Sequence, residues 1–318
     1  MKVLILNEHE VHELLTMGEC IAVMEDALST LARGEAHQPL RSLVRAPGAS
    51  GFLGLMPAYR GGKTSYFGLK EVCVFPSNPW RGLDTHLGAV LLHSGETGEL
   101  LAIVNASAVT AIRTAAVSAV ATRLLARDDA STLAVIGAGV QARSHIYSIP
   151  LVRKIREVRV FSRNRTQAES LGVTLAPSVE AAVRDADIIV TATSSKEPVL
   201  LRNWIAPGTH INAVGSSVST SRELDSAAVA ASSLFVDRRE STVNESGDYL
   251  FALRDGAITE DHIRGEIGDL LLGRTKGRSS PDEITLFKSL GLAIEDLAAA
   301  AFLYEKAQRA GAGTRVTF

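Results

Sequence analysis

Cysteine is scarce in this 318-residue chain. Only Cys20 and Cys73 are present, and they do not form a C-x-x-C pair. The scarcity excludes a disulfide scaffold, and the spacing offers no cluster of the kind that binds zinc. We expect two reduced thiols buried in a core and no metal site. Apolar packing must then hold the chain together, and 46% apolar residues provide ample material for roughly two domains.

The chain also lacks a block of positive charge and a long apolar run. Its formal net charge is −2 and its Lys and Arg residues are spread along the sequence, so we expect no nucleic-acid partner. No apolar run reaches the roughly 18 residues of a membrane helix. The start, MKVLILNEHEVHELL, is not followed by the small-residue cleavage site of a signal peptide. We expect a soluble, cytoplasmic protein with no membrane partner.

The first half of the chain predicts an antiparallel or mixed sheet with flanking helices. A helix is predicted over residues 8 to about 33. Strands are predicted in VLIL, RSLVRA, GFLGLMPAY, YFGLKEVCVF and GAVLLHSGETGELLAIV, with SGETGE as a hairpin turn. An Ala-rich helix over about 106–126 then leads into a second domain.

The second half alternates strands and helices, a pattern typical of a parallel sheet in an α/β fold. Strands are predicted in STLAVIGAG, EVRVFS, DIIVTAT, HINAVGS and SLFVD, and helices in VQARSHIYSIPLVRK, TQAESLG and SVEAAVRDA. The last long segment, PDEITLFKSLGLAIEDLAAAAFLYEKAQ, predicts a helical C-terminus that packs back on the first domain.

A glycine motif follows the first strand of the second half. Gly137, Gly139 and Ala142 in LAVIGAGVQA have the G-x-G-x-x-A spacing, and the motif opens a helix within a βαβ unit. Gly137 permits a tight turn, Gly139 lets the backbone approach a pyrophosphate, and Ala142 allows close helix–strand packing. The free N–H groups at the helix start would face the phosphates. The alternative is a glycine turn without a ligand.

No acidic residue stands at the end of the next strand, where one would hydrogen-bond the ribose of NAD. The sequence there is VFSRNRTQ, with Ser162, Arg163, Asn164 and Arg165. Two guanidinium groups favour a 2′-phosphate and hence NADP(H), with NAD(H) possible. Alternatively, both arginines only decorate a solvated turn.

Three cations of the first half have apolar or small neighbours. Arg41 lies in QPLRSLV, Lys70 in YFGLKEVCVF and Arg113 in TAIRTAA. A cation in such a place must reach solvent, pair with an acid or bind a ligand. Three of them beside a dinucleotide fold predict a carboxylate clamp, in which lysine could also polarise an imine. Surface charge or an internal ion pair is the alternative for each.

These stretches resemble the ornithine cyclodeaminase/μ-crystallin family along nearly the whole chain. The matching segments are GLMPAY, FGLKEV, TGELLAIVNASAVTAIRTAAVSAVAT, VIGAGVQA, INAVGS and EITLFKSLGLAIEDLAAA. The resemblance implies a Rossmann NAD(P)-binding domain at 119–290. It also implies a mixed α/β substrate and dimerisation domain at 1–118, completed by C-terminal helices at 291–318. A homodimer and a small imino or amino acid substrate, handled through an imine with a nicotinamide cofactor, are implied as well.

The resemblance also assigns roles to single residues. It implies that Arg41, Lys70 and Arg113 contact the substrate carboxylate, and that Gly291 joins Leu290 where cofactor and substrate meet. The implied cofactor contacts are Thr85, Arg113, Gly137, Gly139, Val140, Gln141, Ser162, Arg163, Arg165, Thr193, Ile211 to Val214, and Leu290. Without the resemblance, FKSLGLAIEDL would be interpreted as a plain packed helix.

Three departures from the family pattern bear on the reaction. Ser217 in AVGSSVS stands at the position where, by the resemblance, the cyclodeaminases and the family's alanine dehydrogenases have an aspartate that serves as acid and base. Gly54 stands where the ornithine enzymes have a glutamate, and Ser162 where NAD-specific members have an aspartate. The ketimine reductases of the family resemble the chain at Ser217 and in the arginine-containing turn.

The missing aspartate favours reduction of a preformed cyclic imine. Cyclodeamination must move several protons through a placed base, whereas a protonated imine chiefly needs positioning. We expect an NADP-dependent reductase of Δ1-pyrroline-2-carboxylate or Δ1-piperideine-2-carboxylate that forms proline or pipecolate, with Ser217 on a proton path. The alternatives are an ornithine cyclodeaminase, with Ser217 relaying protons through water to Asp225, an alanine dehydrogenase-like enzyme, and a protein that stores NADPH without turnover.

Overall fold

The computed structural model describes residues 2–318 and divides the chain into two compact units. Unit 1 comprises residues 1–113 and 292–318, and unit 2 comprises residues 114–291. The boundary between the units falls after Arg113, inside helix α3 (Ala106–Leu125). The sequence had predicted this boundary five residues later, after residue 118. Each unit has its own sheet.

Unit 1 is built on an eight-stranded mixed sheet in the order β16-β1-β7-β6-β5-β4-β2, with β3 paired to β4. β1 runs parallel to β7, and the other neighbours are antiparallel. The elements are β1 (Lys2–Leu6), α1 (Glu8–Leu14), α2 (Met17–Ala32), β2 (Ala36–His37), β3 (Ser42–Val44), β4 (Phe52–Arg60), β5 (Tyr66–Val74), β6 (His86–Ser94), β7 (Leu100–Asn105), α11 (Ala293–Ala310) and β16 (Thr314–Thr317), with a 3-10 turn at Asn78–Arg81. The predicted mixed sheet and the hairpin between β6 and β7 are confirmed.

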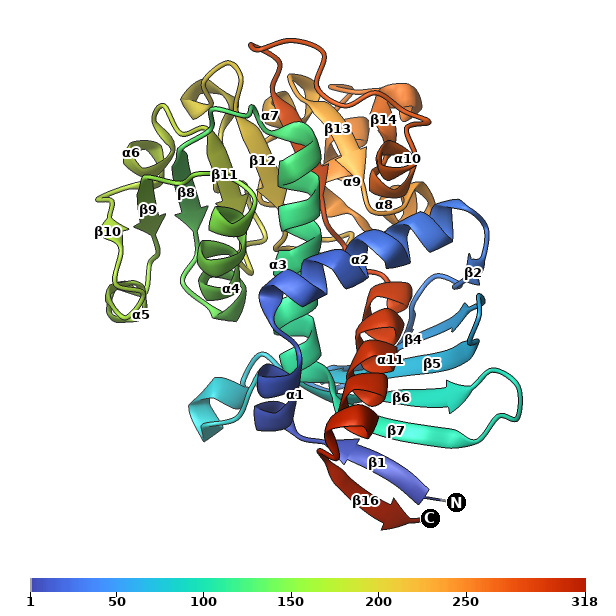
Figure 1. The fold of residues 1–318 in the computed structure, drawn as a ribbon. Helices are drawn as coiled ribbons and strands as arrows, with labels where there is room; N and C mark the ends of the chain where they lie inside the picture. The colour runs from blue at the N-terminus through green and yellow to red at the C-terminus, as the bar shows by residue number, and fades with distance from the viewer. Residues whose placement is uncertain (1) are drawn as a thin grey trace. The chain divides into compact units, whose positions relative to one another are not determined.

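The structure has two helices, α1 and α2, where the sequence predicted one over residues 8 to about 33. Asn7 and Glu10 form a capping box that begins α1, and Thr16 and Glu19 form a second one that begins α2. Because the second box starts a new helix at Thr16, the chain turns between them. In unit 1, α11 packs against α2 and against strands β4 to β7 (Figure 1).

Unit 2 is built on an eight-stranded sheet in the order β10-β9-β8-β11-β12-β15-β13-β14, with every neighbouring pair parallel. The strands are β8 (Thr132–Ile136), β9 (Glu157–Phe161), β10 (Thr174–Leu175), β11 (Ile188–Thr191), β12 (His210–Ala213), β13 (Ser233–Val236), β14 (Ile263–Glu266) and β15 (Thr285–Lys288). The helices are α4 (Val140–Ser148), α5 (Arg165–Glu169), α6 (Val179–Val183), α7 (Ser226–Ala230), α8 (Arg239–Glu245), α9 (Gly247–Arg254) and α10 (Ile267–Leu271), with 3-10 turns at Ile149–Leu151, Arg202–Trp204 and Glu260–His262.

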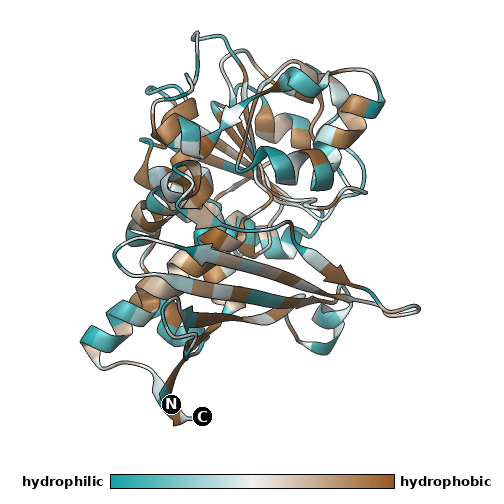
Figure 2. Ribbon diagram, turned by 90° about the vertical axis from the view of Figure 1, so that its right-hand side faces the viewer, coloured by the Kyte–Doolittle hydropathy of each residue, from teal (hydrophilic) through white to brown (hydrophobic). Residues whose placement is uncertain are grey.

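The first six strands of this sheet have the 3-2-1-4-5-6 order of the Rossmann fold, with β8 as the first strand and β11 and β12 as the fourth and fifth. Strands β11 and β12 are buried along their whole length, and the central strands of the unit are largely brown, hence hydrophobic, in Figure 2. A parallel sheet covered on both faces requires such apolar strands. The predicted fold class, a Rossmann domain plus a mixed α/β domain, is confirmed.

The prediction of one helical segment over residues 281–308 was wrong at its start. Thr285–Lys288 form β15, which lies between β12 and β13, and only Ala293–Ala310 are helical. All four residues of β15 are buried. A strand buried on both faces shows no alternation, so its apolar run cannot be told from a buried helix by periodicity.

Helix α3 is long and apolar enough to cross a membrane by length and composition, which the sequence analysis had not anticipated. However, 78% of its most apolar 18-residue window is buried inside the protein. A core helix of a globular protein meets the same criterion, and the burial of α3 agrees with that role.

Two histidines lie fully buried in unit 2. His145 Nδ1 is 2.7 Å from the Gln141 carbonyl oxygen and its Nε2 is 2.8 Å from Ser118 Oγ. His210 Nδ1 is 2.9 Å from Thr285 Oγ1. Burial lowers the pKa of His145 to about 4 and that of His210 to about 3. Both imidazoles therefore stay neutral in the folded protein at pH values where the unfolded chain takes up protons.

We expect each histidine to cost about 2 kcal/mol of stability between pH 7.5 and pH 5, because below pH 6.5 only the unfolded chain protonates it. Urea unfolding of a His145→Asn variant across this range should show a pH-dependent loss smaller by about that amount. The matched control is His9→Asn, at an exposed position. Equal pH dependence in wild type and His145→Asn would contradict the assignment.

Candidate functional site

The glycine turn after β8 has the geometry that the sequence motif predicts. Gly137 has φ +121°, and a Cβ there would lie 2.4 Å from the Ala192 carbonyl oxygen. Gly139 precedes α4 as its N-cap, and nothing lies within 4 Å of the place of its Cβ. Ala142 is fully buried. The turn therefore offers unblocked space at a helix start, as a bound pyrophosphate needs.

The first two residues of α4 lie at this turn. Val140 is exposed although it is apolar, and Gln141 is half-buried, with its carbonyl oxygen bonded to His145. An exposed valine beside unblocked N–H groups agrees with a surface that a ligand covers. Their predicted role at the pyrophosphate stays a prediction.

The segment after β9 holds the residues predicted to choose the cofactor. Asn164 caps α5 by accepting from Gln167 N, and Ser162 Oγ accepts from Asn164 N at 3.2 Å. Arg165 forms an exposed ion pair with Glu169, 3.1 Å between Nε and Oε1. Arg163 is exposed and has no ion-pair or hydrogen-bond partner within residues 2–318. Arg163 is therefore the better placed of the two to meet a 2′-phosphate.

The loops after β11 and β12 hold Thr193, Val214 and Ser217. Thr193 N donates to Glu223 Oε1 at 2.7 Å, and Val214 is buried. Ser217 is half-buried, and its hydroxyl finds no hydrogen-bond partner in the described part of the chain. That hydroxyl is free to meet a ligand.

The first acids after β12 serve the structure of unit 2. Glu223 is fully buried, and its other carboxylate oxygen accepts from Thr191 Oγ1 at 2.8 Å. Asp225 caps α7 by accepting from Ala228 N, and it also accepts from Arg202 N. Both bonds go to Oδ1 and anchor the carboxylate to the backbone at Arg202 and at the start of α7, so they speak against the proton relay to it that the sequence left open.

The predicted residues Leu290 and Gly291 lie in a turn held by Asp237. Both backbone N–H groups donate to Asp237 Oδ2, at 2.6 and 2.8 Å, and Gly291 has φ +79°. The carboxylate fixes this turn at the end of unit 2.

Unit 1 brings Lys70 and Arg113 onto one carboxylate. Lys70 Nζ lies 3.1 Å from Asp296 Oδ1 and donates to Thr110 Oγ1 at 2.6 Å. Arg113 Nε is also 3.1 Å from Asp296 Oδ1, and its Nη1 is 2.9 Å from Glu295 Oε2. Lys70 and Arg113 are each only 5% exposed. The internal ion pair that the sequence left as an alternative is therefore present for both cations.

The pairing does not exhaust the donors of Lys70. An ammonium has three N–H groups, and among the described residues Asp296 and Thr110 take two of them. Burial lowers the pKa of Lys70 to about 8, although the Asp296 charge opposes this effect. The cluster can thus present one N–H to a ligand from an amine that is protonated at neutral pH.

Two further predicted residues of unit 1 lie elsewhere in the chain. Arg41 lies in the connection between β2 and β3 and is half-exposed. Thr85 directly precedes β6, and its carbonyl oxygen accepts from Phe75 N. Partial desolvation and the charge of Lys70 both lower the pKa of His86, the next residue. The predicted roles of Arg41 and Thr85 in binding substrate and cofactor stay predictions.

Sequence reasoning missed the acids of this cluster and a second buried set in unit 2. Glu295 and Asp296 stand in the apolar run AIEDLAAAA, and Lys288 in TLFKSL. All three are almost completely buried. The signal that drew attention to Lys70, a charge inside an apolar segment, was present at each of them.

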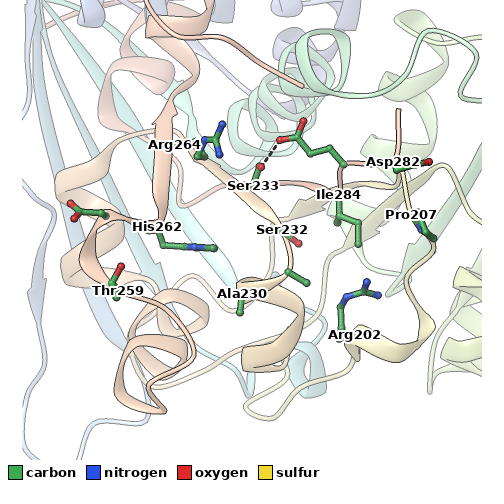
Figure 3. A pocket seen from close by; sticks show the side chains of 13 residues that line it. Arg202, Pro207, Ala230, Ser232, Ser233, Thr259, His262, Arg264, Asp282 and Ile284 are labelled. Atoms are coloured by element: carbon green, nitrogen blue, oxygen red, sulfur yellow. Dashed lines mark hydrogen bonds between the residues drawn. The ribbon is translucent and has the colours of Figure 1, made fainter. Parts of the chain in front are cut away.

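A cavity of about 720 Å³ in unit 2 is lined by none of the predicted site residues. Its lining includes Ser233, the first residue of β13, and Ile284, just before β15, together with Arg202, His262 and Arg264 (Figure 3). It therefore opens at the amino ends of the strands. Dinucleotides bind at the carboxyl ends of parallel strands, so this cavity is not the expected cofactor site.

Comparisons with known proteins agree with this arrangement. The sequence profile of the ornithine cyclodeaminase/mu-crystallin family matches residues 1–311. The ketimine reductase mu-crystallin of Mus musculus is 37% identical over 310 residues, which cover 94% of this chain and 96% of that protein. Match and coverage extend over both units.

Two solved structures are similar to the whole chain. The Thermococcus litoralis Δ(1)-pyrroline-2-carboxylate reductase in complex with NADH and L-proline has a TM-score of 0.94 and 39% identity, covering 99% of this chain and all of that one. An archaeal alanine dehydrogenase dimer with bound NAD also has a TM-score of 0.94, with 34% identity and full coverage of both chains. The chain therefore belongs to the ornithine cyclodeaminase/mu-crystallin family.

Proposed function

We propose that this protein reduces a cyclic ketimine carboxylate, Δ1-pyrroline-2-carboxylate or Δ1-piperideine-2-carboxylate, to proline or pipecolate. Unit 2 supplies the dinucleotide turn, and unit 1 supplies Lys70 and Arg113 for the substrate carboxylate. A bound reduced nicotinamide supplies the hydride that adds to the imine carbon. Similarity to a ketimine reductase and to a reductase holding NADH and L-proline supports the proposal.

The commitment of Glu223 and Asp225 to structural hydrogen bonds is the observation on which the choice of reaction rests. Ser217 is the first hydroxyl of the loop after β12 that has no side-chain partner within residues 2–318, because the Ser216 hydroxyl donates to Ser195. Cyclodeamination requires a placed base for repeated proton transfers. Reduction of a cyclic imine that arrives protonated needs no such base, because the product amine keeps the proton that the imine brought.

In this reaction the residues of unit 1 bind and orient the substrate. Arg113 offers a planar guanidinium to the carboxylate, and Lys70 directs its remaining N–H toward the carboxylate. As hydride adds to the imine carbon, the nitrogen gains a lone pair, and it can then accept from the same N–H. Both are already held in place by Asp296. Such preorganised charge lowers the barrier because nothing has to rearrange as the reaction proceeds.

A second candidate is an amino-acid dehydrogenase or cyclodeaminase. The lowered pKa of Lys70, about 8, favours it, because an amine that titrates near neutral pH can also accept a proton from a substrate ammonium. Similarity to an archaeal alanine dehydrogenase supports this candidate too.

Steady-state assays with a small substrate panel separate the candidates. We expect rapid NADPH or NADH consumption with both cyclic imines, and slow or no ammonia release from ornithine or alanine with the oxidised cofactors. Efficient ammonia release from ornithine would establish a cyclodeaminase instead. Cofactor binding without turnover on any substrate would establish a storage protein. Light scattering of the same sample tests the homodimer that we also propose.

We further propose a preference for NADPH, which Arg163 supports because its guanidinium is exposed and without a partner in the described chain. Arg163→Ala should raise the KM for NADPH about tenfold, as expected for the loss of a charge-assisted phosphate contact, with little change in the KM for NADH. Arg165→Ala is the matched control, since its side chain already pairs with Glu169. Equal effects of Arg163→Ala on both cofactors would refute the preference.

A further inference from the structure

Lys288 is the most deeply buried lysine of unit 2 that the proposed reaction does not use. It ends β15 and is only 1% exposed. Its Nζ donates to the Gly215 carbonyl oxygen at 2.8 Å and pairs with Asp248 Oδ2 at 2.8 Å. Burying an ammonium is costly unless hydrogen bonds and a counter-charge compensate for the lost hydration. The fold therefore has to keep both contacts of Lys288 in place.

Asp248 continues the connection from Lys288. It is the second residue of α9, and its Oδ1 accepts from the backbone N–H groups of Glu223 and Leu224, at 2.8 and 2.9 Å. Glu223 in turn accepts from Thr193 N and Thr191 Oγ1. One chain of buried charged groups therefore links β15 to the loops after β11 and β12.

The two loops lie close together at Gly215. A Cβ there would lie 2.1 Å from the Thr193 carbonyl oxygen and 2.6 Å from Glu223 Oε1. The next residue, Ser216, has φ +49°, and its hydroxyl donates to the Ser195 carbonyl oxygen. Backbone bonds from Gly215 N to the Thr191 carbonyl oxygen, 3.1 Å, and from Ser216 N to the Thr193 carbonyl oxygen, 3.2 Å, hold this segment, and Lys288 adds a charged donor to the Gly215 carbonyl oxygen.

The position of these loops in the sheet decides which part of a cofactor they serve. The turn at Gly137 and the segment at Arg163 follow the first and second strands, β8 and β9. Gly215 and Thr193 follow the fifth and fourth, β12 and β11. In this strand order the first βαβ half takes the adenosine side of a dinucleotide, and the second half takes the other nucleotide.

We propose that Lys288 is a positioning residue for the nicotinamide half of the cofactor. It touches neither cofactor nor substrate. Through Gly215 directly, and through Asp248 and Glu223 indirectly, it fixes the loops on which that half rests. The inference depends on the proposed function only in requiring a nicotinamide dinucleotide.

The test compares two ligands that differ by the nicotinamide riboside part. We expect Lys288→Met to bind 2′-phospho-ADP-ribose, or ADP-ribose if NADH is preferred, within twofold of wild type. The fluorescence enhancement of bound NADPH or NADH should fall, and hydride transfer at saturating cofactor should slow about 30-fold, as for a misplaced reacting group. Lys306→Met, which removes a surface ion pair with Glu19, is the matched control and should behave as wild type.

A second variant guards against simple misfolding. In Asp248→Asn/Lys288→Met the buried ion pair is removed as a unit, so Glu223 loses the attraction of Lys288 and the repulsion of Asp248 together. Asn keeps an oxygen for the two backbone N–H groups, but the bond to Gly215 is still missing. It should show the same nicotinamide-specific loss. Equal weakening of fragment and whole cofactor, or an unchanged hydride-transfer rate in the double variant, would overturn the inference. Failure of the wild type to bind either dinucleotide would instead refute the proposed function.

Discussion

A Lys70→Met variant is expected to lose about a thousandfold in kcat/KM for the cyclic imine, equivalent to about 4 kcal/mol of transition-state stabilisation. Methionine matches the length of lysine but offers neither a charge nor an N–H group. It leaves the carboxylate to Arg113, and the nitrogen that gains a lone pair as hydride adds is left without its donor. The loss should fall mainly on kcat, because the imine interaction strengthens as hydride is transferred.

Stopped-flow kinetics with the preferred cofactor measures this loss, and cofactor binding by fluorescence checks that unit 2 is intact. The control is Lys63→Met, the same substitution at an exposed position between β4 and β5. Wild-type kcat/KM should also decline above about pH 8, where Lys70 loses its charge. Activity of Lys70→Met within tenfold of wild type would show that the lysine has no part in the reaction.

Replacing Asp296 by asparagine should impair both stability and the pH profile. Its carboxylate holds Lys70 and Arg113 in a buried site, and removing one member of such a group typically costs about 3 kcal/mol. The Asp296 charge also raises the pKa of Lys70 against the effect of burial. Without it the pKa falls further, so the alkaline decline of kcat/KM should begin at lower pH.

Urea unfolding and a pH–rate profile test these two effects separately. Asp26→Asn, which removes a surface ion pair with Arg60, is the control and should change neither. An alkaline limb of Asp296→Asn that stays in place or moves to higher pH would show that Asp296 does not control the charge on Lys70.

Local patterns predicted the parts of the fold that depend on neighbouring residues. The hairpin between β6 and β7 follows from its glycine turn, and the turn after β8 follows from Gly137 and Gly139. Strand β15 was missed because its assignment depends on parallel pairing with β12 and β13, which are distant in sequence. A four-residue apolar run does not reveal such partners.

The candidate site shows the same division. The sequence singled out Lys70 and Arg113 from their apolar neighbours, but it could not show that both meet Asp296, which is 226 residues after Lys70. Likewise, the serine at position 217, where relatives have an aspartate, was visible in the sequence, whereas the structural role of Glu223 was not. Charges inside apolar runs mark buried sites, and only the folded chain shows which charges meet.

The pairing of β1 with β16 has a consequence for how the protein forms. Unit 1 combines residues from before and after unit 2, whereas unit 2 is one uninterrupted stretch. The sheet of unit 2 therefore needs no residue beyond 291, whereas the sheet of unit 1 is complete only when β16 has been made. A stalled or prematurely terminated product would display the apolar side of an unfinished sheet, which makes it a target for chaperones and proteases.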